Sequence, residues 1–76
     1  MKFSYKEQKE FETIDEDIEK LEHAIADKDR LIGLNASDFV KLNQLTTEKE
    51  ELENKLEEKM ERWEYLNELN EKIQQQ

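Results

Sequence analysis

Two long runs of mostly apolar residues, spaced alternately three and four apart, constrain the fold more than any other feature of the chain. The first run is Phe11, Ile14, Ile18, Leu21, Ile25, Lys28 and Ile32. The second run is Leu42, Leu45, Lys49, Leu52, Leu56, Lys59, Trp63, Leu66, Asn70 and Ile73. This alternation is the two-position seam of a coiled-coil heptad. Each run therefore predicts a long helix with one apolar face.

The segment between the two runs, GLNAS at residues 33–37, holds the only concentration of helix-stopping residues in a chain without proline. Gly33 suits the left-handed position after a helix end, and Asn35 or Ser37 can cap the next helix. A short connection makes two long helices antiparallel neighbours. We therefore predict an all-α fold: one domain over residues 1–76, an antiparallel two-helix coiled-coil hairpin with helices over 14–32 and 37–74 and a turn near 33–37.

The N-terminal part carries two capping boxes, Ser4-x-x-Glu7 and Thr13-x-x-Glu16. In a capping box the hydroxyl accepts from one backbone N–H and the glutamate accepts from another. These boxes predict a short helix over residues 5–12, a bend near Thr13, and then the long helix. One continuous helix from 5 to 32 is the open alternative.

Folding the chain at the predicted turn pairs residues whose numbers sum to about 70, which places Ile14 opposite Leu56. On this register Trp63 lies opposite residues 6–8 and is predicted to be a buried plug at the open end of the stem. The second helix then outruns the first, so Leu69 and Ile73 are left uncovered. They could support weak self-association.

Composition narrows the function. The chain is 43% charged with a net charge of −9, which argues against a broad electrostatic grip on phosphate. It has no cysteine, no apolar run near the ~18 residues of a membrane span and no signal peptide, which indicates a cytoplasmic protein without membrane contact. His23 is the lone histidine, and no Glu-x-x-His motif, phosphate-binding glycine loop or paired nucleophile and base occurs. We therefore expect no catalytic activity, no metal and no cofactor in this chain.

One cluster of basic residues is a candidate binding surface. Two lysines share a face of the predicted short helix, a basic stripe follows the second helix, and aromatic residues lie among them. Such interleaving is typical of nucleic-acid surfaces. Glutamates occupy the same turns, so the competing interpretation is ion pairing within the stem around an aromatic plug, which the sequence alone favours. The candidate nucleic-acid-binding residues are Lys6, Lys9, Lys55, Lys59, Arg62 and Tyr65.

The motifs at the two ends resemble a known domain. The opening KFSYKEQKEFETI, an acidic amphipathic helix, a short turn and a second helix ending in ERWEYLNEL resemble the C-terminal coiled-coil domain of ABC-F ATPases, particularly the Uup-like branch. That family segment typically begins with Ser-Tyr-Lys-Glu-Gln and then has a Leu-Pro break before the long helix. Ser4 to Gln8 match this opening, whereas Thr13 and Ile14 stand in place of the Leu-Pro break.

The resemblance implies an accessory domain of a larger ATPase that acts on ribosomes and translation. ATP and magnesium would bind in the parent's two cassettes, with which this domain would be linked. The same branch is associated with DNA binding, so DNA or ribosomal RNA is the implied partner, and Lys6, Lys9 and Arg62 lie in the matching motifs. Lys55 and Lys59 join them only through the register. The alternatives are a protein-interaction or dimerisation coiled coil and an arm of a translation enzyme such as a tRNA synthetase.

Overall fold

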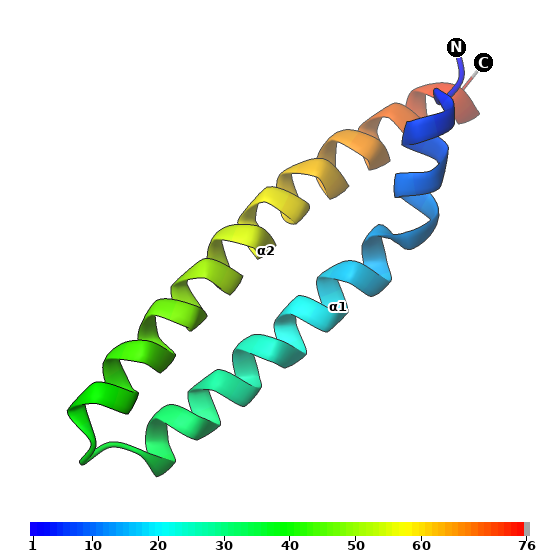
Figure 1. Ribbon diagram of the computed structural model, residues 1–76. Coiled ribbons are helices and arrows are strands. Elements are labelled where there is room, and N and C mark those ends of the chain that lie inside the picture. Colours follow the sequence, from blue (N-terminus) through cyan, green and yellow to red (C-terminus); the bar gives the residue numbers. More distant parts are fainter. Residues whose placement is uncertain (76) are drawn as a thin grey trace.

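The computed structural model describes residues 1–75 and shows two helices that pack side by side in opposite directions (Figure 1). Helix α1 spans Tyr5–Leu34 and helix α2 spans Phe39–Gln74. The molecule is a rod of 58 × 16 × 14 Å, with both termini at one end, here called the open end, and the turn at the other, here called the tip. The predicted all-α hairpin is confirmed.

Helix α1 begins at the predicted capping box. Ser4 Oγ accepts from the backbone N–H of Glu7 at 3.2 Å, and Glu7 Oε1 accepts from the backbone N–H of Ser4 at 2.9 Å. The second predicted box does not form. The helix runs through Thr13 without interruption, so the separate short helix over residues 5–12 is wrong and the continuous alternative is right.

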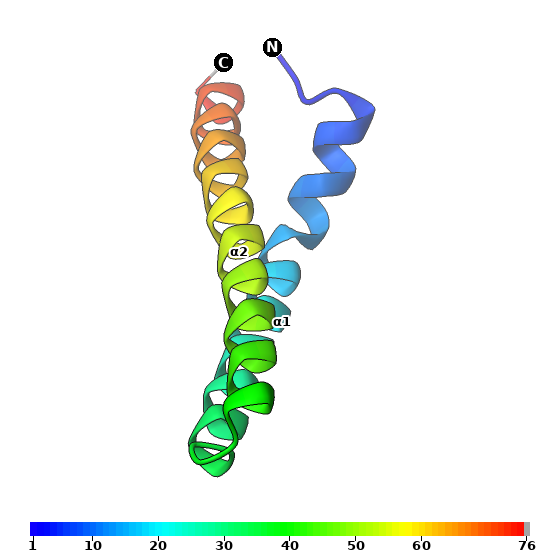
Figure 2. The same cartoon turned by 60° about the vertical axis from the view of Figure 1, so that its left-hand side comes forward.

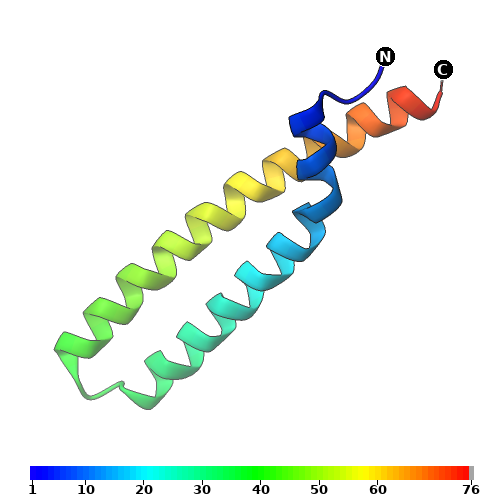
Figure 3. The ribbon, with the colours of Figure 1, turned by 45° about the vertical axis from the view of Figure 1, so that its right-hand side comes forward.

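Helix α1 nevertheless changes direction in its N-terminal third, which crosses in front of α2 in the view of Figure 3 and leans away from α2 to one side in Figure 2. The Thr13 hydroxyl lies in this region with the carbonyl oxygens of Lys9 and Glu10 at 3.4 and 3.5 Å and with Asp17 Oδ2 at 3.4 Å. A threonine hydroxyl that donates back to the carbonyl of the preceding turn bends a helix. The predicted bend is therefore present, without the predicted break.

The turn lies later in the chain than the sequence suggests. Gly33 is inside α1 and has a negative φ, so its predicted left-handed role is wrong. Helix α1 ends at Leu34 and is capped by Asn35, whose side-chain amide donates to the carbonyl of Leu31 at 2.8 Å. Asp38, rather than Asn35 or Ser37, caps α2 by accepting from the backbone N–H of Lys41 at 3.2 Å. Residues 35–38 therefore form the connection.

The apolar seam lies between the helices as predicted. Ile14, Leu45 and Leu66 are buried, at 1%, 5% and 0% exposure. The other seam residues are half-buried, including the methylene stems of the seam lysines, which keep their ammonium groups near water. Trp63 is the exception: it is 37% exposed.

The predicted register is wrong along the stem and holds approximately only at the bent open end, where Arg62 with Glu10 and Tyr65 with Glu7 sum to 72. Four contacts that cross the stem pair residues whose numbers sum to 76 or 78 instead of about 70: Lys28 with Glu48, Lys49 with Asp29, Lys59 with Asp17, and Trp63 with Asp15. Part of this shift follows from the later turn, which moves the pivot of the hairpin toward the C-terminus. The remaining part of the shift coincides with ion pairs across the stem, in which lysines of each helix lie within 3.5 Å of carboxylates of the other helix.

This register changes the environment of two predicted features. Trp63 lies beside Asp15, to which its indole N–H donates at 2.8 Å, and not beside residues 6–8, so it is a partly exposed, hydrogen-bonded side chain instead of a buried plug. Leu69 and Ile73 are half-buried, so the prediction that nothing covers them is wrong. Over residues 1–75, neither helix combines the length and hydropathy that crossing a membrane requires.

Candidate nucleic-acid interface

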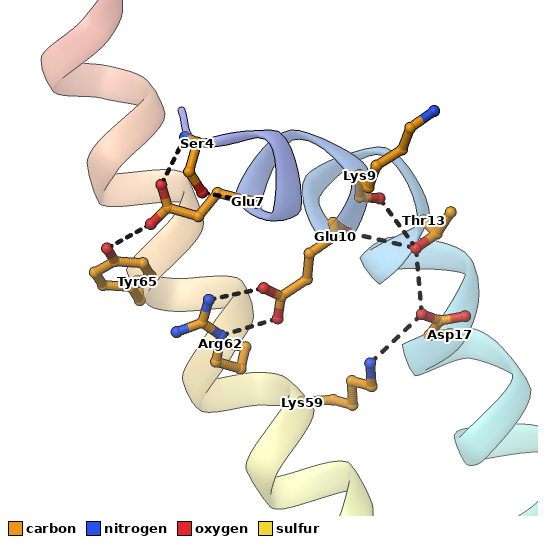
Figure 4. Close-up of polar contacts among 9 residues, drawn as sticks. All are labelled: Ser4, Glu7, Lys9, Glu10, Thr13, Asp17, Lys59, Arg62 and Tyr65. Carbon is orange, nitrogen blue, oxygen red and sulfur yellow. Dashed lines mark hydrogen bonds and ion pairs between the residues drawn. The ribbon is translucent and has the colours of Figure 1, made fainter. Parts of the chain in front are cut away.

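Arg62 is held at the open end by a carboxylate from α1. Its Nε and Nη2 atoms donate to Glu10 Oε2 and Oε1 at 2.8 and 2.7 Å, a two-point pairing between residues 52 apart in the chain (Figure 4). The guanidinium also lies 4.7 Å from the centre of the Tyr65 ring. The hydrogen bonds from Arg62 lower the pKa of Glu10, and those to Glu10 raise the pKa of Arg62. Two-point geometry makes this the best oriented of the ion pairs across the stem.

Tyr65 is tied to the start of α1. Its hydroxyl donates to Glu7 Oε2 at 2.7 Å, while the other oxygen of Glu7 completes the capping box with Ser4 (Figure 4). The backbone hydrogen bond from Ser4 and then the Tyr65 hydroxyl lower the pKa of Glu7. The same bond to a carboxylate raises the pKa of Tyr65, because ionising the phenol would remove the donor. The tyrosine therefore fastens the bent end of α1 to α2.

Below this point a groove runs between the two helices, with a volume of about 560 Å³. Four of its lining residues are cationic, two are acidic and one is leucine. We call it the basic groove, and its lining residues are Lys20, Lys55, Lys59, Arg62, Asp17, Glu58 and Leu21. It is a local excess of positive charge on a chain whose net charge is −9.

The lysines of the basic groove differ in how firmly they are held. Lys59 pairs with Asp17 at 3.5 Å, and Lys20 pairs with Glu16 at 3.4 Å while both side chains remain about 70% exposed. Lys55 forms no ion pair with any other residue of the described part of the chain. Exposed pairs contribute roughly 0–1 kcal/mol, so Lys20 and Lys55 can turn toward an external anion at little cost.

The structure brings some of the predicted site residues together and separates others. Lys55, Lys59 and Arg62 line one groove, and Tyr65 adjoins Arg62. Lys6 is exposed and lies outside the groove lining. Lys9 extends away from α2, with its ammonium 5.7 Å from the centre of the Tyr5 ring (Figure 4).

Lys20 is a groove residue that the sequence analysis did not identify. Because Lys20 lies four residues after Glu16 on the same helix, the two look like an ordinary ion pair within one helix. Only the observed register places it across the stem from Lys55 and Lys59. Predicting the register from lysine–carboxylate pairs between the two helices, instead of from a turn at Gly33, would have placed Lys20 in the groove.

A second groove, of about 450 Å³, lies along α1 and is lined by Glu16, Glu19, Lys20, His23, Ala24 and Asp27. His23 lies on the exposed side of α1, with Nε2 3.7 Å from Glu19. Within residues 1–75, no group of three or more histidine, aspartate or glutamate side chains is arranged to hold a metal ion.

Comparison with known protein families decides where this hairpin belongs. The family model described as the ABC transporter C-terminal domain matches residues 2–68, which include all of α1, the turn and α2 as far as residue 68. The chain belongs to this family. It is thus an accessory domain of an ABC protein, and the bent end of α1 and the basic groove both lie inside the matched region. No curated protein and no solved structure matches the chain significantly.

Proposed function

We propose that this ABC transporter C-terminal domain is a non-catalytic nucleic-acid-contacting module, and that its contact surface is the basic groove. The partner would be DNA or ribosomal RNA, bound through its phosphate backbone. The observation that carries the proposal is the convergence of Lys20, Lys55, Lys59 and Arg62 on one groove of a strongly acidic chain. Lysine and arginine that displace counterions from phosphate supply most non-specific nucleic-acid affinity.

Within the groove the residues have different roles. Lys55, which has no ion pair with the described residues, and Lys20, whose pair is solvated, would contact phosphate directly. Arg62 and Tyr65 are engaged by Glu10 and Glu7, so they would position the groove wall instead of reaching for a ligand. This differs from the sequence prediction, in which Arg62 and Tyr65 were themselves contact residues.

The parent protein is proposed to be a Uup-like ABC-F ATPase of the cytoplasm, associated with ribosomes and translation. The support is the pair of end motifs, Ser4 to Gln8 and the ERWEYLNEL segment, together with the family match. ATP hydrolysis would then take place in the parent's cassettes. The hairpin would act by holding the basic groove against a phosphate backbone while the cassettes cycle.

The experiment is a salt-dependent binding titration of a labelled DNA duplex and a ribosomal RNA fragment with the 76-residue chain. Lys55→Glu should weaken binding about tenfold at low salt and make the salt dependence shallower, since fewer counterions are released. The matched control is Lys41→Glu, which changes the net charge equally but lies at the tip, on the first turn of α2.

Two results would refute the proposal. One is no detectable binding of either nucleic acid at low salt. The other is equal loss in Lys55→Glu and Lys41→Glu, which would indicate that net charge and not the groove sets the affinity.

A further inference from the structure

One cation of the basic groove is already occupied by a carboxylate of the chain itself. Arg62 lines the groove, yet its Nε and Nη2 atoms both donate to Glu10, which lies outside the lining (Figure 4). Arginine pairs with carboxylates and with phosphates in the same two-point geometry. Glu10 therefore takes the position on Arg62 that a phosphate group of a ligand would take.

Glu10 also reduces the positive charge of the groove. The lining has four cationic and two acidic side chains, so one further carboxylate cancels half of its net positive charge. The pKa of Glu10 is lowered first by the hydrogen bonds from Arg62, and to a smaller extent by the charges of Arg62 and Lys59. The carboxylate thus attracts two of the four groove cations.

The pairing of Glu10 with Arg62 depends on the bend in α1. Contacts along the stem join residues whose numbers sum to 76 or 78, whereas the contacts of Glu10 and Glu7 with α2 sum to 72. If the register of the stem continued unchanged, Arg62 would lie opposite residues 14–16, about one helical turn or more from Glu10. The conformation of residues 5–13, here called the bent segment, therefore decides whether Arg62 is occupied.

The bent segment is weakly held against α2. None of its residues is buried, and the first buried side chain of α1 is Ile14. Two long carboxylate side chains, Glu7 and Glu10, supply its hydrogen bonds to α2, and Arg62 remains 46% exposed (Figure 4). Segments held by solvated polar contacts open locally at a lower free-energy cost than segments that bury apolar side chains. An external anion can therefore compete with Glu10 for Arg62.

We propose that the bent segment is an autoinhibitory element of the basic groove, in which Glu10 occupies Arg62 until a phosphate of the nucleic-acid backbone displaces it. Displacement loosens the bent segment from α2 and adds Arg62 to the cations that bind the ligand. While Glu10 is bound, Arg62 is only part of the groove wall. This inference rests on the proposed function of the groove and adds a restraint on its affinity that the chain itself supplies.

The first test compares the affinities of wild type, Glu10→Ala and Glu12→Ala for the same labelled DNA duplex at low salt. Glu12 is the matched control, because it is exposed on the same segment, loses the same charge and is hydrogen-bonded within α1, to Gln8. Glu10→Ala should bind about two- to fivefold more tightly than Glu12→Ala, the factor by which an exposed ion pair would hold Arg62 back. Its log–log salt dependence should be steeper by ~0.9, since one more phosphate is contacted. In an Arg62→Gln background this advantage should largely disappear.

Hydrogen exchange supplies a readout that a change of charge alone would not move. Saturating duplex should speed the exchange of the backbone amides of residues 8–13 in wild type, because displacing Glu10 loosens the bent segment. The amides around the buried Leu45 should not exchange faster. Circular dichroism would verify that each variant stays helical.

The outcomes separate this inference from the proposed function. Binding by wild type, with equal affinities for Glu10→Ala and Glu12→Ala, would overturn the autoinhibitory element and leave the proposed function standing. Exchange at residues 8–13 that slows or does not change on binding would also overturn it, because Glu10 would not have been displaced. No binding by any of the three forms would refute the proposed function, and this inference with it.

Discussion

Leu66 and Leu34 offer the same side chain in opposite environments, and truncating each to alanine tests where the stability of the hairpin resides. Leu66 is completely buried, opposite the bent end of α1, whereas Leu34 is 71% exposed at the tip. Removing three buried carbons costs about 2.4 kcal/mol of transfer free energy, and an unfilled cavity adds to this. Because a two-helix stem can partly close around the gap, we expect Leu66→Ala to lower the free energy of unfolding by about 2.5–3 kcal/mol.

That loss is large for this chain. At ~0.05–0.15 kcal/mol per residue, a 76-residue domain has about 4–11 kcal/mol of stability, and three buried side chains place this one at the low end. Urea unfolding would be monitored by far-ultraviolet circular dichroism. With a urea m-value of about 1 kcal/mol/M, Leu66→Ala should lower the unfolding midpoint by about 2–3 M. Leu34→Ala should stay within about 0.5 kcal/mol. Similar losses in both variants, or less than about 1 kcal/mol for Leu66→Ala, would refute the assigned core.

Two further predictions concern the open end. The pKa of Glu10 is lowered by its hydrogen bonds from Arg62, so the folded state binds this proton more weakly than the unfolded state. The stabilisation from the ion pair is therefore present above the ordinary carboxyl pKa of 4.5 and is lost as the pH falls below it. Glu10→Gln should therefore cost about 0.5–1 kcal/mol in urea melts at pH 7, and less at pH 3; an equal cost at both would exclude the ion pair as its source. Because Ile73 is half-buried, the chain should sediment as a monomer over a wide concentration range. A sedimenting mass that rises with concentration in the wild-type chain but not in Ile73→Asp would instead support a dimerisation coiled coil.

Some of the candidate site was predictable because neighbouring positions on one helix keep a fixed spacing. Lys55, Lys59 and Arg62 follow each other on α2, and they line one groove as the sequence implied. Lys20 was missed because its place depends on the other helix. Lys6 and Lys9 were assigned to the same surface, but neither lines the groove, and Lys9 extends away from α2 (Figure 4).

The sequence by itself determined the two helices, their shared apolar seam and the capping box at Ser4. These features follow from interactions between residues three or four apart, which are the same in any context. Only the tertiary structure decided the register, the partly exposed Trp63 and the hold of Glu10 on Arg62. Their physical cause is the pairing of residues up to 58 apart, which depends on where the turn falls and on which carboxylates and cations then meet across the stem.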